Sequence, residues 1–193
     1  MKICVFGAAS NLIDNSYIEA VEVLGEEMAK RGHSLVFGAG ANGLMGAVAR
    51  GVAKYGGEIC GVIPEFFKEE GVELIYDGCN EIIYTETMAQ RKSKMGELAD
   101  AFIIVPGGIG TFEEFFEIIT LKQLDRHTKP IALYDINGYY RKLEDFLDFS
   151  VSEQFIRKGF KHLYSCVANP KEALDYIEND KQEKINIKDV KIG

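Results

Sequence analysis

Short apolar runs alternate with longer stretches of helical spacing along most of the chain. The runs predict strands, because they are four or five residues long and β-rich. These predicted strands cover residues 3–6, 34–37, 59–63, 81–84, 101–105 and 130–134. Between them, apolar side chains recur every three or four positions, which predicts helices. The predicted helices cover residues 15–31, 44–55, 87–99, 111–124, 139–150 and 170–177.

This alternation predicts an α/β fold: a Rossmann-like, doubly wound parallel sheet in three α/β/α layers. Right-handed crossovers would place every strand-to-helix loop at the carboxyl edge of the sheet, where we expect the ligand site. Residues 66–78 have a mixed pattern and predict a loop. We expect a single nucleotide-binding domain over residues 1–177 and a Lys-rich C-terminal tail, mobile or added to the sheet edge, over residues 178–193.

Composition narrows the class of protein. The 193 residues are 47% apolar and 27% charged, as in a soluble globular domain. The net charge of -8 argues against a nucleic-acid binder, since phosphate contacts need clustered cations. No apolar run approaches the ~20 residues that span a membrane. The chain enters a strand at once without a signal peptide, which predicts a cytoplasmic protein. Four cysteines without a C-x-x-C pair predict free thiols and no metal site.

The strongest chemical signal is the segment from Pro106 to Glu114, P-G-G-I-G-T-F-E-E. It joins a wholly apolar strand to a helix through a glycine-rich turn. Glycines allow a ligand to approach the backbone, and the first amides of a helix bind anions. Thr111 would cap the helix or contact a phosphate. A tight turn with an N-cap Thr and dipole-favoured acids is the alternative interpretation.

The two acids of this segment face different ways. Glu114 shares a helical stripe with Ile118 and Leu121 and is expected to face the core, whereas Glu113 lies on a more polar face. An acid that faces inward at the ligand edge is costly unless it is paired or functional. We therefore single out Glu114 as a candidate catalytic residue.

A cation is also predicted to face inward. Arg91 occupies the same helical stripe as Met88 and Met95. It either packs its stem against the core and extends its head to water, or presents a guanidinium to an anion or to Glu114. Lys92 on the neighbouring face could add a phosphate contact.

A second glycine-rich run, residues 38–43, has the form G-x-G-x-x-G between a strand and a helix. This spacing matches a dinucleotide-binding fingerprint, and Glu65 could be the acid that contacts the ribose. An NAD-dependent oxidoreductase is thus an alternative, although the chain lacks a second substrate domain. A third small-residue turn, residues 7–10, places Ser10 at the same sheet edge.

Several pieces of the sequence occur together in a recognisable order. They are GLMG at 43–46, GVIP at 61–64, Met88 with Arg91, Lys92 and Met95, and the P-G-G-x-G-T-x-x-E run ending at Glu114. Together they resemble the LOG family, the cytokinin riboside 5′-monophosphate phosphoribohydrolases, long mislabelled as lysine decarboxylases. The resemblance covers about residues 1–168. Ala39 and Ala89 depart from the family pattern, which bears on the base pocket and leaves the catalytic pair intact.

The resemblance implies a homodimer that hydrolyses the N-glycosidic bond of a nucleoside 5′-monophosphate without a cofactor. AMP or amine-substituted AMP of the cytokinin type would be the substrate. Arg91 and Glu114 match the catalytic pair of the family. From the loops and the resemblance together, the predicted substrate-binding residues are Ser10, Gly43, Met88, Lys92, Gly107, Gly108, Gly110, Thr111, Glu113 and Thr120.

The resemblance leaves two roles open for Glu114, as a nucleophile or as the group that activates water. We expect Arg91 to lower the pKa of Glu114 and keep it charged near neutral pH. A non-catalytic carrier or sensor of a nucleotide or cofactor is the alternative function. Pure binding has no need for an inward pair of Arg91 and Glu114.

Overall fold

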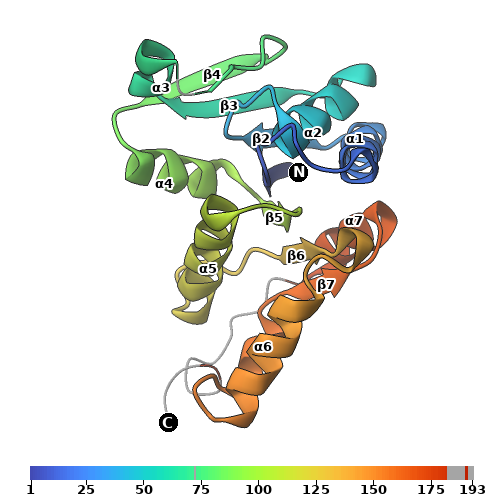
Figure 1. Cartoon of the computed structure of the whole chain (residues 1–193), viewed down its shortest axis with the longest axis vertical. Helices are drawn as coiled ribbons and strands as arrows, with labels where there is room; N and C mark the ends of the chain where they lie inside the picture. Colours follow the sequence, from blue (N-terminus) through green and yellow to red (C-terminus); the bar gives the residue numbers. More distant parts are fainter. Residues whose placement is uncertain (72, 182–189, 191–193) are drawn as a thin grey trace.

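The structure, a computed structural model, describes residues 1–71, 73–181 and 190 (Figure 1). These residues form a seven-stranded sheet in the order β4-β3-β2-β1-β5-β6-β7, and every neighbouring pair is parallel. The predicted doubly wound α/β fold is confirmed. The strands are β1 (Lys2–Phe6), β2 (Ser34–Phe37), β3 (Ile59–Pro64), β4 (Glu81–Thr85), β5 (Ala101–Ile104), β6 (Ile131–Tyr134) and β7 (Ser165–Val167).

Helices cover both faces of the sheet and make three layers (Figure 1). One face carries α1 (Asn15–Lys30), α2 (Gly43–Lys54) and α7 (Pro170–Asn179), and the other carries α4 (Met88–Leu98), α5 (Ile109–Gln123) and α6 (Arg141–Ser152). Each face has its own hydrophobic cluster, so the sheet separates two cores. The shorter helices are α3 (Glu65–Glu70), η1 (Ile136–Gly138) and η2 (Lys158–His162).

Local sequence explains most of these elements. All four residues of β5 are at most 1% exposed, as expected for a central strand covered on both faces. The stripe predicted in α1 buries Val21, Leu24 and Met28. Thr87 caps α4 as predicted, since its side chain accepts a 3.1 Å hydrogen bond from the amide of Gln90.

Three elements differ from the prediction. Residues 66–78 are not simply a loop: they include most of α3, whose six residues are too few to show a helical period. The strand β7 was not predicted because its three residues are too few to form a recognisable apolar run. Helix α5 begins at Ile109, two residues earlier than expected.

The C-terminal part of the chain is described only in part. Helix α7 ends at Asn179, two residues beyond the predicted domain end at residue 177. Val190 is 1% exposed and packs in the cluster beneath α5 and α6, and Gln123 donates a 2.5 Å hydrogen bond to its carbonyl. Most of the predicted tail, residues 182–189 and 191–193, lies outside the described residues.

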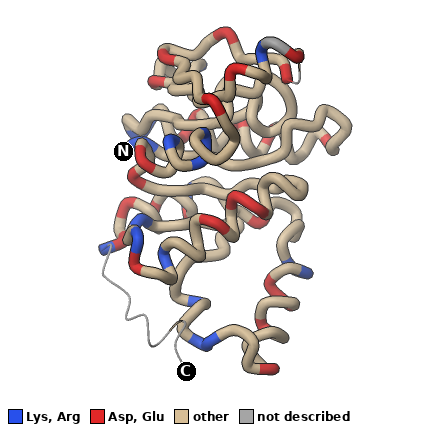
Figure 2. The backbone as a smooth tube through the Cα atoms, turned by 90° about the vertical axis from the view of Figure 1, so that its left-hand side faces the viewer, with Lys and Arg blue, Asp and Glu red and all other residues tan. Residues whose placement is uncertain are grey.

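The distribution of charged residues, the hydropathy of the helices and the state of the cysteines bear on the expectations from composition. Acidic positions are spread over the upper, middle and lower parts of the backbone, interspersed with fewer basic ones (Figure 2). Among the helices that the structure describes, none is long and apolar enough to cross a membrane. The four cysteines are all free, and Cys4 is buried whereas Cys166 is exposed.

The strand order positions the candidate site. β1 and β5 are neighbours at the centre of the sheet, and the chain leaves them toward opposite edges. The loops after such a pair diverge and leave a crevice above the carboxyl ends of the strands.

Candidate active site

A cavity of about 300 Å³ lies at this divergence of the loops after β1 and β5. Ala8 and Ser10 line it from the β1 side, and Gly107 and Gly108 line it from the β5 side. Ser10 is exposed, and its hydroxyl accepts a 3.2 Å hydrogen bond from the amide of Leu12. Tyr139, which follows η1, closes a further side. The structure thus brings the predicted Ser10 and the predicted glycine loop together.

The amino terminus of α5 faces this crevice with unused amides. Gly108 is its N-cap residue and provides no side-chain cap. Within the part of the chain that the structure describes, no group accepts a hydrogen bond from the amides of Ile109, Gly110 or Thr111. Gly108 and Gly110 are exposed with nothing within 4 Å of an added Cβ. Free amides at the positive end of a helix form an anion site.

Thr111 is the third helical residue of α5, so its predicted alternative role as the N-cap is wrong. The residue is buried, and its hydroxyl makes no hydrogen bond to any described group. It packs against Gly107, where an added Cβ would lie 2.1 Å from Thr111 Oγ1, so this position needs glycine.

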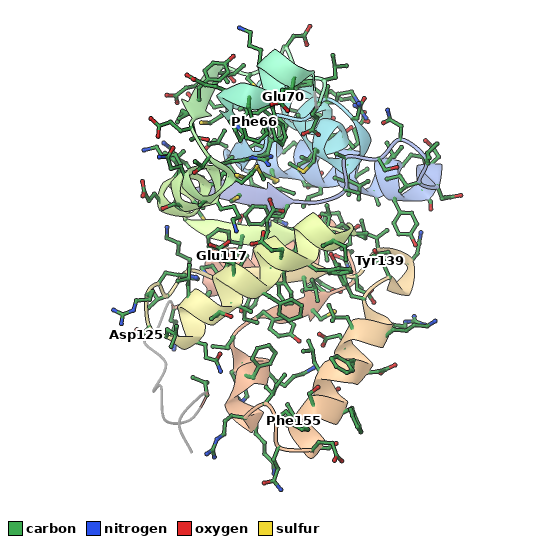
Figure 3. All side chains as sticks on the ribbon, turned by 60° about the vertical axis from the view of Figure 1, so that its left-hand side comes forward. Phe66, Glu70, Glu117, Asp125, Tyr139 and Phe155 are labelled. Atoms are coloured by element: carbon green, nitrogen blue, oxygen red, sulfur yellow. The ribbon has the colours of Figure 1, made fainter. Side chains whose placement is uncertain are left out.

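Tyr139 is a residue that the sequence pattern did not indicate. Its hydroxyl donates a 2.6 Å hydrogen bond to the carbonyl of Gly107 and so holds the glycine loop. Figure 3 shows Tyr139 beside the amino-terminal end of α5. Its position just after a strand, at the carboxyl edge, was the signal that could have identified it.

The G-x-G-x-x-G run has a different local structure. The first amides of α2 are already bonded, since Gly43 donates to Asn11 Oδ1 at 2.8 Å and Leu44 donates to the carbonyl of Ala8 at 2.8 Å. Gly43 is packed beneath the loop of residues 8–10, with φ +56°. Glu65 is exposed at the start of α3, beyond β3. These contacts disfavour the dinucleotide interpretation, because the first amides of α2 are not free to bind a pyrophosphate.

Glycine in this second run makes room for side chains. A Cβ added to Gly38 would lie 1.7 Å from Arg91 Nη2, and one added to Gly40 would lie 2.2 Å from Glu73 Oε1. Ala39 between them has φ 64°, a conformation that glycine adopts more easily.

Arg91 is buried, with 8% of its surface exposed. Its Nε donates to the carbonyl of Val62 and its Nη2 donates to the carbonyl of Gly38, both at 3.1 Å. Although the structure describes both side chains, it contains no ion pair between Arg91 and Glu114 within 4.0 Å. Backbone carbonyls at the ends of β2 and β3 therefore fix the guanidinium, and Glu114 does not.

Glu114 is largely buried on the first turns of α5 and lines a second cavity, of about 510 Å³, between α4 and α5. Burial raises the pKa of this carboxyl group to about 7, while the charge of Arg91 lowers it by less. The expectation that Arg91 would keep the pKa of Glu114 low is wrong, because desolvation outweighs an unpaired guanidinium. At neutral pH, both protonation states of Glu114 are populated.

Lys92 holds two carboxylates of α5 together. Its ammonium group pairs with Glu113 and, at 2.6 Å, with Glu117. Figure 3 shows Glu117 along α5. A substrate phosphate would have to share this cation with both acids.

Two further predicted residues lie on the surface of α4 and α5. Met88 is 39% exposed at the start of α4, and its sulfur accepts a weak contact from Arg91 Nη1 at 3.8 Å. Thr120 is exposed on α5. Among the described residues, no three His, Cys, Asp or Glu side chains gather in a way that could hold a metal ion.

The sequence is similar to known proteins over most of its length. Residues 45–177 match a family model described as possible lysine decarboxylase. A probable cytokinin riboside 5′-monophosphate phosphoribohydrolase from Oryza sativa subsp. japonica is 39% identical, over 92% of this chain and 70% of the relative. A cytokinin riboside 5′-monophosphate phosphoribohydrolase from Arabidopsis thaliana is 37% identical, over 92% of this chain and 82% of the relative. These relatives support a hydrolase.

Solved structures share the fold at lower identity. The molybdenum cofactor carrier protein of Chlamydomonas reinhardtii has a TM-score of 0.71 and 21% identity, covering 94% of this chain and 98% of its own. The molybdenum cofactor binding protein of Rippkaea orientalis has a TM-score of 0.68 and 18% identity, covering 92% and 93%. These values establish the Rossmann-like fold alone.

Proposed function

Because the chain belongs to the LOG family of phosphoribohydrolases, we propose that it hydrolyses the N-glycosidic bond of nucleoside 5′-monophosphates. AMP and AMP substituted on its exocyclic amine are the proposed substrates, and a free base and ribose 5-phosphate are the products. What supports this proposal is the largely buried Glu114, near Arg91, on a helix whose first amides have no acceptor among the described residues.

We propose that the 5′-phosphate binds at the amino terminus of α5. The unbonded amides of Ile109, Gly110 and Thr111 and the helix dipole would stabilise its charge. Gly108 and Gly110 leave the approach open, since no atom lies within 4 Å of their Cβ directions.

Cleavage would pass through an oxocarbenium-like state, as in other glycoside hydrolysis. Ionised Glu114 would stabilise the positive charge that develops on the ribose as the C–N bond breaks and its electrons leave with the base. Glu114 would either attack the anomeric carbon, forming an intermediate that water then hydrolyses, or take a proton from the attacking water. In both cases the hydroxyl group of water ends on the ribose and its proton on the released base. Arg91 would supply a fixed positive charge close to the carboxyl group, held by Gly38 and Val62.

Substitution of Glu114 tests this proposal. Glu114→Gln keeps the size of the side chain and removes its charge, so base release from AMP and isopentenyl-AMP should fall at least about 100-fold. Chromatography of the reaction mixture measures the free base. The control is Glu58→Gln, an exposed acid just before β3 at the opposite edge of the sheet. Full activity in Glu114→Gln would exclude the assignment.

The pKa of Glu114 predicts the pH dependence of both activity and stability. Base release should rise as pH increases through about 7, because the ionised carboxylate is the active form. The folded protein binds the proton more tightly than the unfolded chain. The stability from this group is therefore present below its unfolded pKa and is lost as pH rises toward 7. At pH 8, Glu114→Gln should be more stable than the wild type, by on the order of 2 kcal/mol in urea denaturation.

A carrier or sensor function predicts a different result from the same protein. Tight AMP binding in calorimetry without release of base from either nucleotide would favour it over hydrolysis. Release that is lost in Glu114→Gln would favour the hydrolase.

We also propose that the protein is a homodimer. Met88, Phe116 and Leu121 on α4 and α5 are 38–40% exposed and supply apolar surface beside the site. Sedimentation equilibrium should give twice the mass of the chain, and a monomer mass would contradict the proposal. The cytoplasmic location stays a prediction.

A further inference from the structure

The segment that follows β3 folds back over the second glycine-rich loop. Its last part pairs with that loop through an antiparallel bridge between Gly40 and Ile75. Two 2.8 Å hydrogen bonds, from Ala41 to the carbonyl of Leu74 and from Tyr76 to the carbonyl of Ala39, hold it there. Backbone pairing thus places Glu73 at the carboxyl end of β2.

This segment also encloses Arg91. The guanidinium carbon of Arg91 lies 5.6 Å from the centre of the Phe67 ring, which follows Phe66 on α3 (Figure 3). Its Nε and Nη2 are bonded to carbonyls, whereas the single hydrogen-bond acceptor of Nη1 among the described residues is the weakly accepting sulfur of Met88. Part of the donor capacity of Arg91 is therefore unused.

Glu73 is a half-buried carboxyl group near the end of this segment. It lies against Gly40, and among the described residues it takes part in no hydrogen bond or ion pair. Burial raises the pKa of Glu73, and the charge of Arg91 partly offsets this effect. Arg91 therefore acts on two carboxyl groups, Glu73 and Glu114, without pairing with either.

Water can donate to the exposed part of the Glu73 carboxyl group, and a ligand that displaces this water must supply hydrogen-bond donors in its place. The ligand group must carry N–H or O–H donors and no negative charge. A phosphate would be repelled, and the free amides of α5 lie beyond β1, on the β5 side of the site. The two hydroxyl groups of a ribose suit a carboxylate, which can accept from both at once.

We propose that Glu73 is a substrate-binding residue that accepts hydrogen bonds from the ribose hydroxyl groups of the nucleotide. The assignment rests on the proposed function for the identity of the ligand. It makes the segment after β3 part of the site and gives the ribose a contact between the phosphate site and the base.

Two sugar phosphates test this assignment by calorimetry. Ribose 5-phosphate and 2-deoxyribose 5-phosphate differ in one hydroxyl group and contain no bond that the proposed enzyme cleaves. The wild type should bind the ribose form at least about tenfold more tightly. In Glu73→Ala, the preference for ribose should disappear, so that both sugars bind with equal affinity. The affinity for the deoxyribose form should fall by less than that for ribose 5-phosphate, because it loses only the hydrogen bond from its 3-hydroxyl group.

The control is Glu70→Ala, an exposed acid on α3 (Figure 3), which should bind both sugars as the wild type does. An equal loss for both sugars in Glu73→Ala would assign Glu73 a structural role, and no loss would place it outside the site. Either result overturns the proposal. Glu73→Met keeps the side-chain length and removes both acceptor oxygens, and the same loss of preference is required in this variant if Glu73→Ala does not fold.

The calorimetric test of Glu73 does not depend on whether the protein hydrolyses AMP. If the wild type releases no base from AMP but its preference for ribose depends on Glu73, the hydrolase proposal fails and this assignment holds. If base is released and the preference survives in both Glu73 variants, this assignment fails and the hydrolase proposal holds.

Discussion

Two glycine-rich loops lie at the same edge of the sheet, and they have opposite properties. The loop before α5 leaves the amides of Ile109, Gly110 and Thr111 without described acceptors. The loop before α2 has its amides bonded to Asn11 and Ala8. Both follow a buried strand and both precede a helix.

The difference shows what glycine does in each loop. In the α5 loop, the space beside Gly108 and Gly110 is open, so a ligand can approach the backbone. In the α2 loop, Arg91 and Glu73 occupy the space beside Gly38 and Gly40. One loop is therefore suited to bind an anion and the other to position side chains, although the dinucleotide fingerprint occurs in the second.

The largest expected effect comes from filling the space that Arg91 occupies. In Gly38→Ala, the new methyl group would displace the guanidinium and break its hydrogen bonds to Gly38 and Val62. We expect the free energy of unfolding to fall by about 2–3 kcal/mol and base release to fall with it. Urea denaturation measures the first effect. Gly96→Ala on α4, with nothing within 4 Å, is the control, and an unchanged midpoint in Gly38→Ala would contradict this account.

An intermediate effect is expected at the α5 loop. Thr111→Val keeps the shape of the side chain and removes a hydroxyl group that bonds to no described residue. Affinity for ribose 5-phosphate should fall about tenfold, because a hydrogen bond to a charged group is lost, while stability should hardly change. Calorimetry measures the affinity, with Thr128→Val, beyond the end of α5, as the control. Lower stability with unchanged affinity would show that the hydroxyl group is structural.

The smallest effect is expected from a substitution at Gly110, in the open loop before α5. Gly110→Ala adds a methyl group to an open position in the first turn of α5. The free energy of unfolding should rise by about 0.5–1 kcal/mol, since alanine favours helix over glycine. Affinity for ribose 5-phosphate should decrease, because the methyl group lies on the path to the amides. A variant that is less stable than the wild type would show that Gly110 is needed by the fold.

Much of the site followed from local sequence. Periodicity located Arg91 on the inward face of α4 and Glu114 near the start of α5, and it placed the glycine loop after a buried strand. The segment around Glu73 was assigned to a loop because six helical residues show no clear period. Nothing in that segment indicated that it pairs with residues 39–41, since such pairing is non-local.

The sequence alone predicted the alternation of strands and helices in a doubly wound sheet, apart from α3 and β7. That the ligand binds at the carboxyl edge, and that Arg91 and Glu114 belong to the site, stay predictions of the sequence. Propensity and periodicity act between near neighbours, so they can be read along the chain. Tertiary structure decided which glycine loop stays open, why the pKa of Glu114 rises to about 7, and which carboxyl groups lie close enough to Arg91 for its charge to lower their pKa. Desolvation and amide pairing depend on residues far apart in the sequence, which only the folded chain brings together.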